Sequence, residues 1–258
     1  MLCFDTFAQS KIEAGMGGFA ITLPAYPGSE DQSSYILPFP YFYYKDDRIT
    51  VDREGLVGSL FEGNRWEIDL SFAGGIPVRS EDAAVREGMP DLDWTAEAGP
   101  RLLYYFSGTE ESDSYLRAHT FLRKAIATDF GSIDSVGLKA GVGGEFVQKA
   151  LLFNKELTWT SRLTVNWAND KNLEYFYGVS SQYATSSRPQ FDTHSGYSGT
   201  ELSSGITLKF DNIWLGSFIR YQHFYNTAQA DSPLLQVESN WTVGIGLVWV
   251  FYKTYRTK

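Results

Sequence analysis

Charged side chains that alternate with apolar ones are the residues of this chain best suited to chemistry. Successive side chains of a β-strand point to opposite faces, so charges at every second position share one face. In the stretch LTWTSRLTVNWA (157–168), Leu163 and Trp167 fall on one face and Arg162 on the other. The charged residues expected to share the polar face are Arg101, Arg117, Arg123, Lys139, Arg162, Lys209, Arg220, Glu67, Asp69, Glu97, Glu145 and Glu174.

Charges of both signs can do one of two things if that face encloses a lumen. We expect them to pair across it and leave it largely closed, because an unpaired charge in a narrow space pays a large desolvation penalty. The alternative is an open channel selective for small ions.

The histidines could support a different chemistry, in which a histidine activates a serine nucleophile. His119 is expected inside the lumen, His194 lies beside Ser195 in a long loop, and His223 comes close to Ser239 on the neighbouring strand. None of the three has a serine two residues later, which would put both groups on one face of a strand. A lipid-hydrolysing site is therefore a remote alternative, and we predict no enzymatic activity.

Composition favours an all-β protein and excludes several classes. Aromatic residues make up 16% of the chain and there are 24 glycines, whereas helix-forming segments are scarce. A net charge of −9 with scattered basic residues argues against nucleic-acid binding. Cys3 is the only cysteine, so no internal disulfide and no cysteine zinc site can form. We predict no metal and no cofactor.

Runs of alternating apolar and polar residues recur along the whole chain. We therefore interpret residues 1–258 as a single domain. Tight polar connections such as Ala168 to Lys171 predict antiparallel hairpins. The predicted strands are 11–24, 33–44, 47–60, 65–74, 93–107, 113–128, 132–148, 155–168, 171–181, 200–210, 212–225 and 237–252.

An up-and-down meander of about twelve strands removes its edges by closing into a barrel. A soluble barrel of this size would need more apolar interior than single alternating rows provide, so we expect the apolar rows to face lipid. The prediction is a closed antiparallel transmembrane β-barrel, with a soluble β-sandwich or barrel as the alternative. Aromatic residues expected in the girdles at the two membrane surfaces are Trp66, Trp94, Tyr104, Trp167, Tyr175, Tyr177 and Trp249.

One connection, residues 75–93, is longer than a turn needs. If both termini are periplasmic, counting twelve strands places it in the periplasm. Ser80 as N-cap, acidic residues in the first turn and Gly88 as the stop predict a short helix there. This helix is a candidate docking element, and the alternative is a lid that packs against its own barrel mouth. The candidate partner-binding residues are Ser80, Glu81, Asp82, Arg86, Glu87 and Met89.

Two glycine-rich stretches, 15–18 and 141–144, superficially resemble phosphate-binding loops. Because they lie within alternating strands, we interpret them as sites of bending and close packing in the barrel wall.

Three motifs, in order, resemble the MipA/OmpV family (MltA-interacting protein) of Gram-negative outer-membrane β-barrels. They are PAYPGS (24–29), GMPDLD (88–93) followed by EAGP (97–100), and YFYGV (175–179). The resemblance implies a location in the outer membrane and contact with its lipid. It also implies a scaffold that holds a periplasmic lytic transglycosylase near a bifunctional murein synthase; other members are described as osmoregulated or immunogenic surface proteins.

Overall fold

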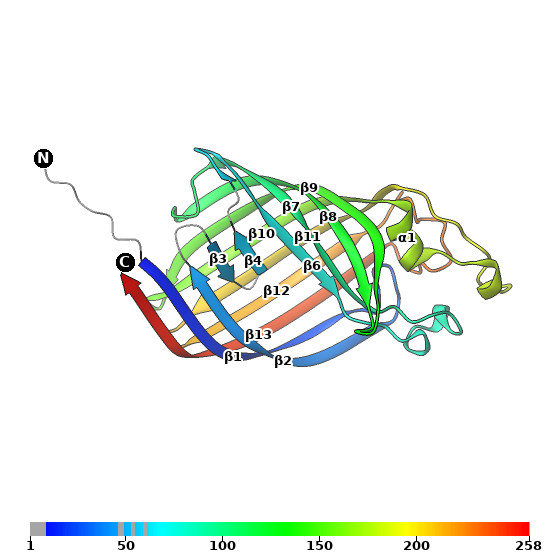
Figure 1. Ribbon diagram of the computed structural model, residues 1–258, viewed down its shortest axis with the longest axis horizontal. Coiled ribbons are helices and arrows are strands. Elements are labelled where there is room, and N and C mark those ends of the chain that lie inside the picture. Colours follow the sequence, from blue (N-terminus) through cyan, green and yellow to red (C-terminus); the bar gives the residue numbers. More distant parts are fainter. Residues whose placement is uncertain (1–8, 46–48, 53–54, 59–60, 258) are drawn as a thin grey trace, which may run out of the picture.

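The computed structural model describes residues 9–45, 49–52, 55–58 and 61–257, so Cys3 lies outside the described residues. It is an antiparallel sheet of thirteen hydrogen-bonded strands that curls on itself (Figure 1). The strands are β1 (Gln9–Pro24), β2 (Gln32–Lys45), β3 (Ile49–Asp52), β4 (Gly55–Gly58), β5 (Phe61–Glu62), β6 (Trp66–Gly75), β7 (Trp94–Ser107), β8 (Ser114–Thr128), β9 (Ile133–Leu152), β10 (Lys155–Ala168), β11 (Gly196–Lys209), β12 (Ile213–His223) and β13 (Ser239–Thr257). The one α-helix is α1 (Asp170–Tyr177), and three short 3₁₀ turns span Ser80–Asp82, Ala84–Arg86 and Ser181–Tyr183.

The sheet is curled because its first and last long strands are neighbours. β1 pairs with β2 on one side and with β13 on the other. The strand order begins at β4 and ends at β5, and no ladder between the described residues joins these two edges. The all-β antiparallel architecture is confirmed, whereas the closed barrel of twelve strands is not.

Two of the predicted strands are wrong. The single strand expected at 47–60 is instead two paired strands, β3 and β4, with Asp52 opposite Gly55, because these two turn-forming residues do not favour a strand interior. Residues 171–181 contain α1, whose N-cap Asn169 accepts a hydrogen bond from the Asn172 backbone N–H at 3.1 Å. Helical spacing puts Leu173 and Tyr177 on one buried face, and this outweighs the apparent alternation.

The faces of the long strands follow the predicted alternation. Leu163 is 49% exposed on the outer face, whereas its neighbour Thr164 is buried inside. The same inversion holds around the sheet, because Asp69 and Glu145 are fully enclosed while apolar side chains face outward. The exposed apolar residues of the outer face include Leu102, Leu122, Val142, Leu202, Ile206, Ile219, Val243, Ile245 and Leu247.

Exposed aromatic residues on the outer face gather near both ends of the strands. Trp66 lies opposite Tyr104 near one end, and Trp167 lies opposite Tyr197 near the other. Of the predicted girdle residues, Trp66, Trp94, Tyr104, Trp167 and Trp249 are exposed on strands. The prediction is wrong for Tyr175 and Tyr177, which belong to α1 and pack in a core.

The two ends of the sheet differ in their connections. The described chain ends, Gln9 and Thr257, lie at one end of the sheet, which carries the short turns 108–113, 153–154 and 210–212 (Figure 1). The opposite end carries four long connections: 25–31, 76–93, 169–195 and 224–238. Segment 76–93 therefore lies at the end opposite the described chain ends, whereas the predicted strand count places it on the same side as the termini.

Candidate functional site

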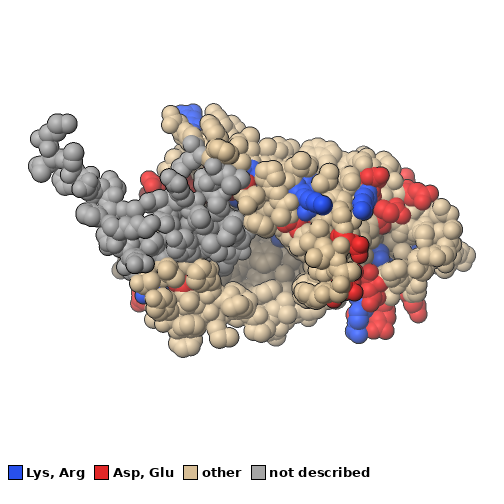
Figure 2. Space-filling model, viewed as in Figure 1, with Lys and Arg blue, Asp and Glu red and all other residues tan. Residues whose placement is uncertain are grey.

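The four long connections share a hydrophobic core, and we call the resulting unit the cap. Its buried side chains come from every one of these connections, with Ala168 at the end of β10 added. Charged side chains gather around this end of the molecule, most of them acidic in the view shown (Figure 2). The buried members are Tyr26, Val78, Ala83, Met89, Leu92, Ala168, Leu173, Tyr177, Val179 and Leu234. The cap is thus a folded unit rather than four independent loops.

Two tyrosines from separate motifs lock the cap together. Tyr26 and Tyr177 meet with ring centroids 6.3 Å apart. The Tyr26 hydroxyl donates to Leu234 O at 2.7 Å, and the Tyr177 hydroxyl donates to Pro27 O at 2.8 Å. Burial raises the pKa of Tyr26 to about 12 and raises the pKa of Tyr177 further. Both hydroxyls therefore remain protonated donors at neutral pH.

The third motif joins the same core. Met89 and Leu92 are buried in it, and the Asp93 backbone N–H donates to the Tyr175 hydroxyl at 2.7 Å. The motifs 24–29, 88–93 and 175–179, far apart in sequence, thus converge in the cap. Their shared role is to fold these connections onto one another.

The segment 80–89 departs from its predicted form. It makes two 3₁₀ turns rather than an α-helix, and Ser80 is the first residue of a turn instead of its N-cap. The predicted stop at Gly88 holds, with φ +79. Of the candidate partner-binding residues, Glu81, Asp82 and Glu87 are exposed and Ser80 is half-buried, whereas Arg86 and Met89 are buried. The segment packs into the cap through Ala83 and Met89.

Arg86 belongs to the interior of the cap. Its guanidinium donates to Phe176 O at 3.0 Å and to Pro90 O at 3.2 Å, and lies 5.6 Å from the centroid of the Tyr26 ring. Burial lowers its pKa from the usual arginine value. These contacts fix the segment in place, so Arg86 is not available to an external partner.

Arg188 has a similar role that its sequence position did not reveal. It donates to Val85 O at 2.7 Å, to Glu87 O at 3.0 Å and to Tyr183 O at 2.8 Å. It therefore ties the connection 169–195 to 76–93. A single arginine in a polar loop follows no periodic pattern, so only the folded backbone carbonyls identify its function.

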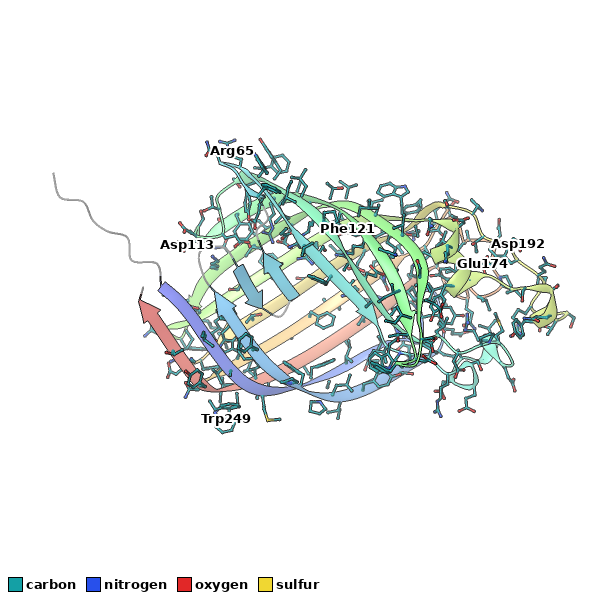
Figure 3. The ribbon with its side chains drawn as sticks, viewed as in Figure 1. Arg65, Asp113, Phe121, Glu174, Asp192 and Trp249 are labelled. Atoms are coloured by element: carbon teal, nitrogen blue, oxygen red, sulfur yellow. The ribbon has the colours of Figure 1, made fainter. Side chains whose placement is uncertain are left out.

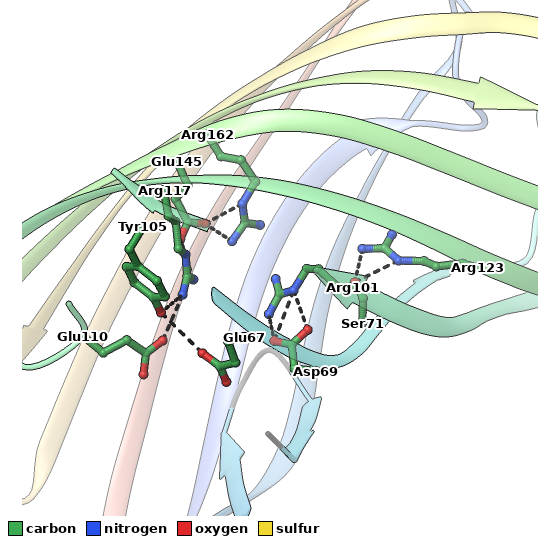
Figure 4. A network of polar contacts seen from close by, with 10 residues as sticks. All are labelled: Glu67, Asp69, Ser71, Arg101, Tyr105, Glu110, Arg117, Arg123, Glu145 and Arg162. Carbon is green, nitrogen blue, oxygen red and sulfur yellow. Dashed lines mark hydrogen bonds and ion pairs between the residues drawn. The ribbon is translucent and has the colours of Figure 1, made fainter. Parts of the chain in front are cut away.

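Below the cap, the ion pairs join neighbouring strands along the wall of the lumen and do not span it, contrary to the expected pairing across the lumen (Figure 4). Glu145 accepts from Arg117 at 2.7 Å and from Arg162 at 2.6 Å, so one carboxylate joins three strands. Arg101 binds Asp69 with two nitrogens. Because these carboxylates are almost fully buried, the arginines supply the counter-charges that their burial requires.

The other charged lumen residues extend the network toward both ends. Glu97 contacts Lys139 at 3.0 Å and Arg123 at 3.5 Å. Arg220 lies 3.4 Å from Glu201, and Lys209 lies 3.8 Å from Glu156 at the end near the termini.

Glu67 and Glu174, both expected in the lumen, make different contacts. Glu67 accepts from the Tyr105 hydroxyl at 3.4 Å. Glu174 is not in the lumen, since it sits on α1 and accepts from Thr193 in the cap (Figure 3). The acidic partners Glu110, Glu156 and Glu201 were missed. Glu156 and Glu201 lie on strands and could have been found by alternation, whereas Glu110 lies in a turn.

Side-chain rings pack directly against glycines of the neighbouring strand, which leaves open space in the lumen. A Cβ at Gly143 would lie 2.8 Å from His119 Cε1, and one at Gly17 would lie 2.7 Å from Phe39 Cζ. Rings on neighbouring strands therefore lie flat against the wall instead of projecting across the lumen. This supports our interpretation of both glycine stretches as sites of close packing.

Two cavities occupy the lumen. One of about 350 Å³ lies under the cap, between Tyr26 and Tyr177 above and Arg101, Arg123 and Lys139 below. The second, of about 680 Å³, is lined by β1, β2 and β10–β13. Arg162 and Arg220 border both cavities. Figure 2 shows the molecule hollowed on the face between β2 and β6.

The histidines occupy three different settings. His119 Nε2 lies 3.0 Å from Thr164 Oγ1 inside the lumen. His223 pairs with Ser239 in the β12–β13 ladder and packs between Tyr221 and Tyr225. His194 lies in the 169–195 connection of the cap.

Solved structures with a similar chain trace are distant in sequence. The NanC porin is 10% identical with a TM-score of 0.39, and the match covers 92% of this chain and 98% of the porin. A bacterial polysaccharide outer-membrane secretin is 9% identical with a TM-score of 0.41, and the match covers 93% of this chain and 99% of the secretin. The toluene transporter TodX of Pseudomonas putida is 11% identical with a TM-score of 0.34, and the match covers 97% of this chain and 75% of TodX. At sequence identities this low, no residue role is transferred from these proteins to this chain.

No curated protein matches the chain in sequence. Among the described residues, no helix is both long and apolar enough to cross a membrane. A model of the family described as MltA-interacting protein MipA matches residues 16–251, which include the whole cap and all charged positions of the lumen discussed above. The protein is thus an outer-membrane β protein, and the chain belongs to the MipA family.

Proposed function

We propose that the protein is a structural barrel of the outer membrane that acts as a scaffold. It would hold a periplasmic lytic transglycosylase near a bifunctional murein synthase, a role consistent with its family's description as MltA-interacting. The observation that carries the proposal is the cap, which covers one end of the lumen, together with the buried ion pairs that cross-link neighbouring strands of its wall. Such an interior suits a rigid support better than a wide pore.

The scaffold proposal needs a surface on the periplasmic side. Outer-membrane barrels have short periplasmic turns and longer external loops. By that rule the end with the termini faces the periplasm, and the cap faces outward. Segment 80–89 would then be unable to reach murein enzymes, so the docking role passes to the turns at the other end.

The β9–β10 hairpin is the best candidate among those turns. Phe153 at its tip is 89% exposed, and the preceding Leu151 is exposed as well. Both residues of the turn, Phe153 and Asn154, have positive φ, which is unfavourable for a residue as bulky as phenylalanine. An exposed aromatic side chain held on a rigid turn is the type of residue that anchors protein interfaces.

A matched control lies at the opposite end of the sheet. Phe130 is 82% exposed in the β8–β9 turn and also has positive φ. Binding of a purified lytic transglycosylase to the detergent-solubilised protein should weaken at least tenfold in Phe153→Ser, which corresponds to about 1.4 kcal/mol. Phe130→Ser should bind like the wild type. Equal effects of the two substitutions, or none, would remove the support for docking at this hairpin.

A channel for small solutes is the second candidate function. The observation that favours it is the pair of adjacent cavities that share Arg162 and Arg220 as a common border. Conductance steps of the wild-type protein in a planar bilayer would support this function, and a silent bilayer would favour the scaffold.

We propose no enzymatic role. A Ser–His site on the lipid-facing wall needs the two groups within about 3 Å. His119 instead contacts a threonine inside the lumen, and His223 packs among tyrosines. Incubation with phospholipid vesicles should release no fatty acid, and release that is lost in His223→Ala would contradict this expectation.

A further inference from the structure

The larger cavity lies between two walls of different chemistry. Phe218, Phe19, Phe39 and Tyr41 line it from β12, β1 and β2. The charged residues among its described lining are Arg162 and Arg220. Its volume of about 680 Å³ is within the range of small-molecule sites, roughly 300–1,000 Å³. The cavity therefore offers aromatic surface and positive charge together.

The aromatic wall leaves room for the flat ring of a bound small molecule. The rings of Phe19 and Phe39 are 5.9 Å apart and tilted by 58°. Phe218 lies against Gly244, where any Cβ would collide with its ring, so this ring is kept close to the wall. Aromatic pairs prefer ring-centroid distances of roughly 4.5–7 Å in offset or tilted arrangements. A ring entering the cavity could adopt such contacts without displacing the wall.

Arg220 supplies the polar end of the cavity. Its side chain is 41% exposed in the lumen, and its guanidinium lies 5.8 Å from the Phe218 ring centroid. Its Nε is buried and makes no hydrogen bond within the described residues, although Glu201 lies 3.4 Å away. Arginine binds planar carboxylates well because its N–H groups form a rigid fork.

We propose that this cavity binds a small aromatic carboxylate. The ring lies among Phe19, Phe39 and Phe218, and the carboxylate pairs with Arg220 beside Arg162. Glu145 and Glu201 stay behind the arginines as their internal counter-charges. A neutral aromatic compound would make no ion pair with the exposed part of the Arg220 guanidinium, and a carboxylate without a ring would leave the apolar wall empty. This site goes beyond the scaffold function and does not depend on it.

Equilibrium dialysis tests the proposal with the full chain in phosphatidylcholine nanodiscs. The probe is 2-naphthoate, with 2-naphthalenemethanol as the neutral analogue and acetate as the carboxylate without a ring. Empty nanodiscs measure partition into lipid, which is subtracted. We expect saturable binding of one 2-naphthoate per chain, and at least tenfold weaker binding of the other two compounds.

Two variants test whether 2-naphthoate binds in this cavity or elsewhere in the lumen. Arg220→Gln should weaken 2-naphthoate binding at least tenfold. Lys209→Gln should change it less than twofold, because Lys209 stacks on Trp214 at the end near the termini and does not line the cavity. Heat-modified migration in gels verifies folding of each variant. If Arg220→Gln does not fold, the comparison of the three compounds on the wild type still decides.

Three outcomes would overturn the proposal. These are no saturable binding of 2-naphthoate, equal binding of 2-naphthalenemethanol, and unchanged binding in a folded Arg220→Gln variant. The second would assign the site to neutral aromatic compounds, and the third would locate 2-naphthoate elsewhere on the protein.

Discussion

Glu145 binds two arginines from different strands, so this carboxylate controls the charge balance in the middle of the lumen. Arg117 approaches it from β8 and Arg162 from β10. Arg117 also contacts Glu110, at 2.9 Å, but the Glu110 side chain is 62% exposed whereas that of Glu145 is 3% exposed. Two carboxylates therefore contact one guanidinium in very different surroundings.

We expect Glu145→Gln to destabilise the fold by about 3–5 kcal/mol, because it leaves buried cationic charge without its partner. Glu110→Gln should change stability by about 1 kcal/mol or less, because an exposed pair is screened by water. Urea unfolding in lipid vesicles, followed by tryptophan fluorescence, measures both. Similar effects of the two substitutions would mean that burial does not determine the strength of these pairs.

At the scale of single elements, the cap is the unit whose behaviour differs most from the strands. The strands are held by backbone ladders, whereas the cap depends on its own core and on side chains such as Tyr26 and Arg188. The cap can therefore open while the sheet persists, since local units of a protein unfold with different free energies.

High pH should open the cap through Tyr26. Its pKa rises from 10.0 to about 12 on burial, so the stability that its protonated form provides is complete below pH 10. That stability is lost as pH rises through 12, because the unfolded form loses its proton first. Hydrogen exchange of residues 224–238 should accelerate over pH 10–12 relative to the β-strands. The acceleration should be smaller in Tyr26→Phe, and an equal rise in both proteins would assign the change to another group.

Replacing Ser80–Met89 with an Asn-Gly turn tests the cap as an element. The change removes Ala83, Arg86 and Met89 from the core, so hydrogen exchange should increase in 169–195. The strands should remain protected, because their ladders do not include this segment. Affinity for a lytic transglycosylase should be unchanged if the cap faces outward. A tenfold loss would return the docking role to this segment.

The strands could be predicted from sequence far better than the connections. Alternation assigned Leu163 outward and Arg162 inward because a strand has a period of two and a slip by one residue reverses the faces. The same alternation misassigned α1, where Asn169 caps a helix, and it did not separate β3 from β4, whose Asp52 and Gly55 pair. The cap core joins residues such as Tyr26 and Leu234, and no local pattern encodes a contact between residues 208 apart.

At the scale of the whole molecule, the outer surface is apolar and the interior carries the charge. This inversion is what an outer-membrane location requires, because lipid contacts the rows that include Leu163 and Leu202. The protein should therefore fold only in detergent or lipid and migrate as a heat-modifiable band in gels.

Leu163→Arg tests the orientation of the wall. It should cost about 2–4 kcal/mol if Leu163 lies near the midplane of the bilayer. Thr164→Ser keeps the hydroxyl that contacts His119 and should cost about 1 kcal/mol or less. Stability measured by urea unfolding in vesicles distinguishes the two. A larger effect of Thr164→Ser would mean that the faces are reversed.

The pairing of β1 with β13 also has a consequence for the order of events during folding. Near this seam Gly28 N–H donates to Asn240 Oδ1, a contact between residues 212 apart, whereas β9 and β10 are joined by a two-residue turn. Each doubling of a loop adds about 0.6 kcal/mol of closure entropy, so the seam is disfavoured by about 4 kcal/mol relative to that hairpin. Hairpins should consequently form early and the seam last. Until then β1 and β13 are open edges, and this interval is when pairing with another chain is most dangerous.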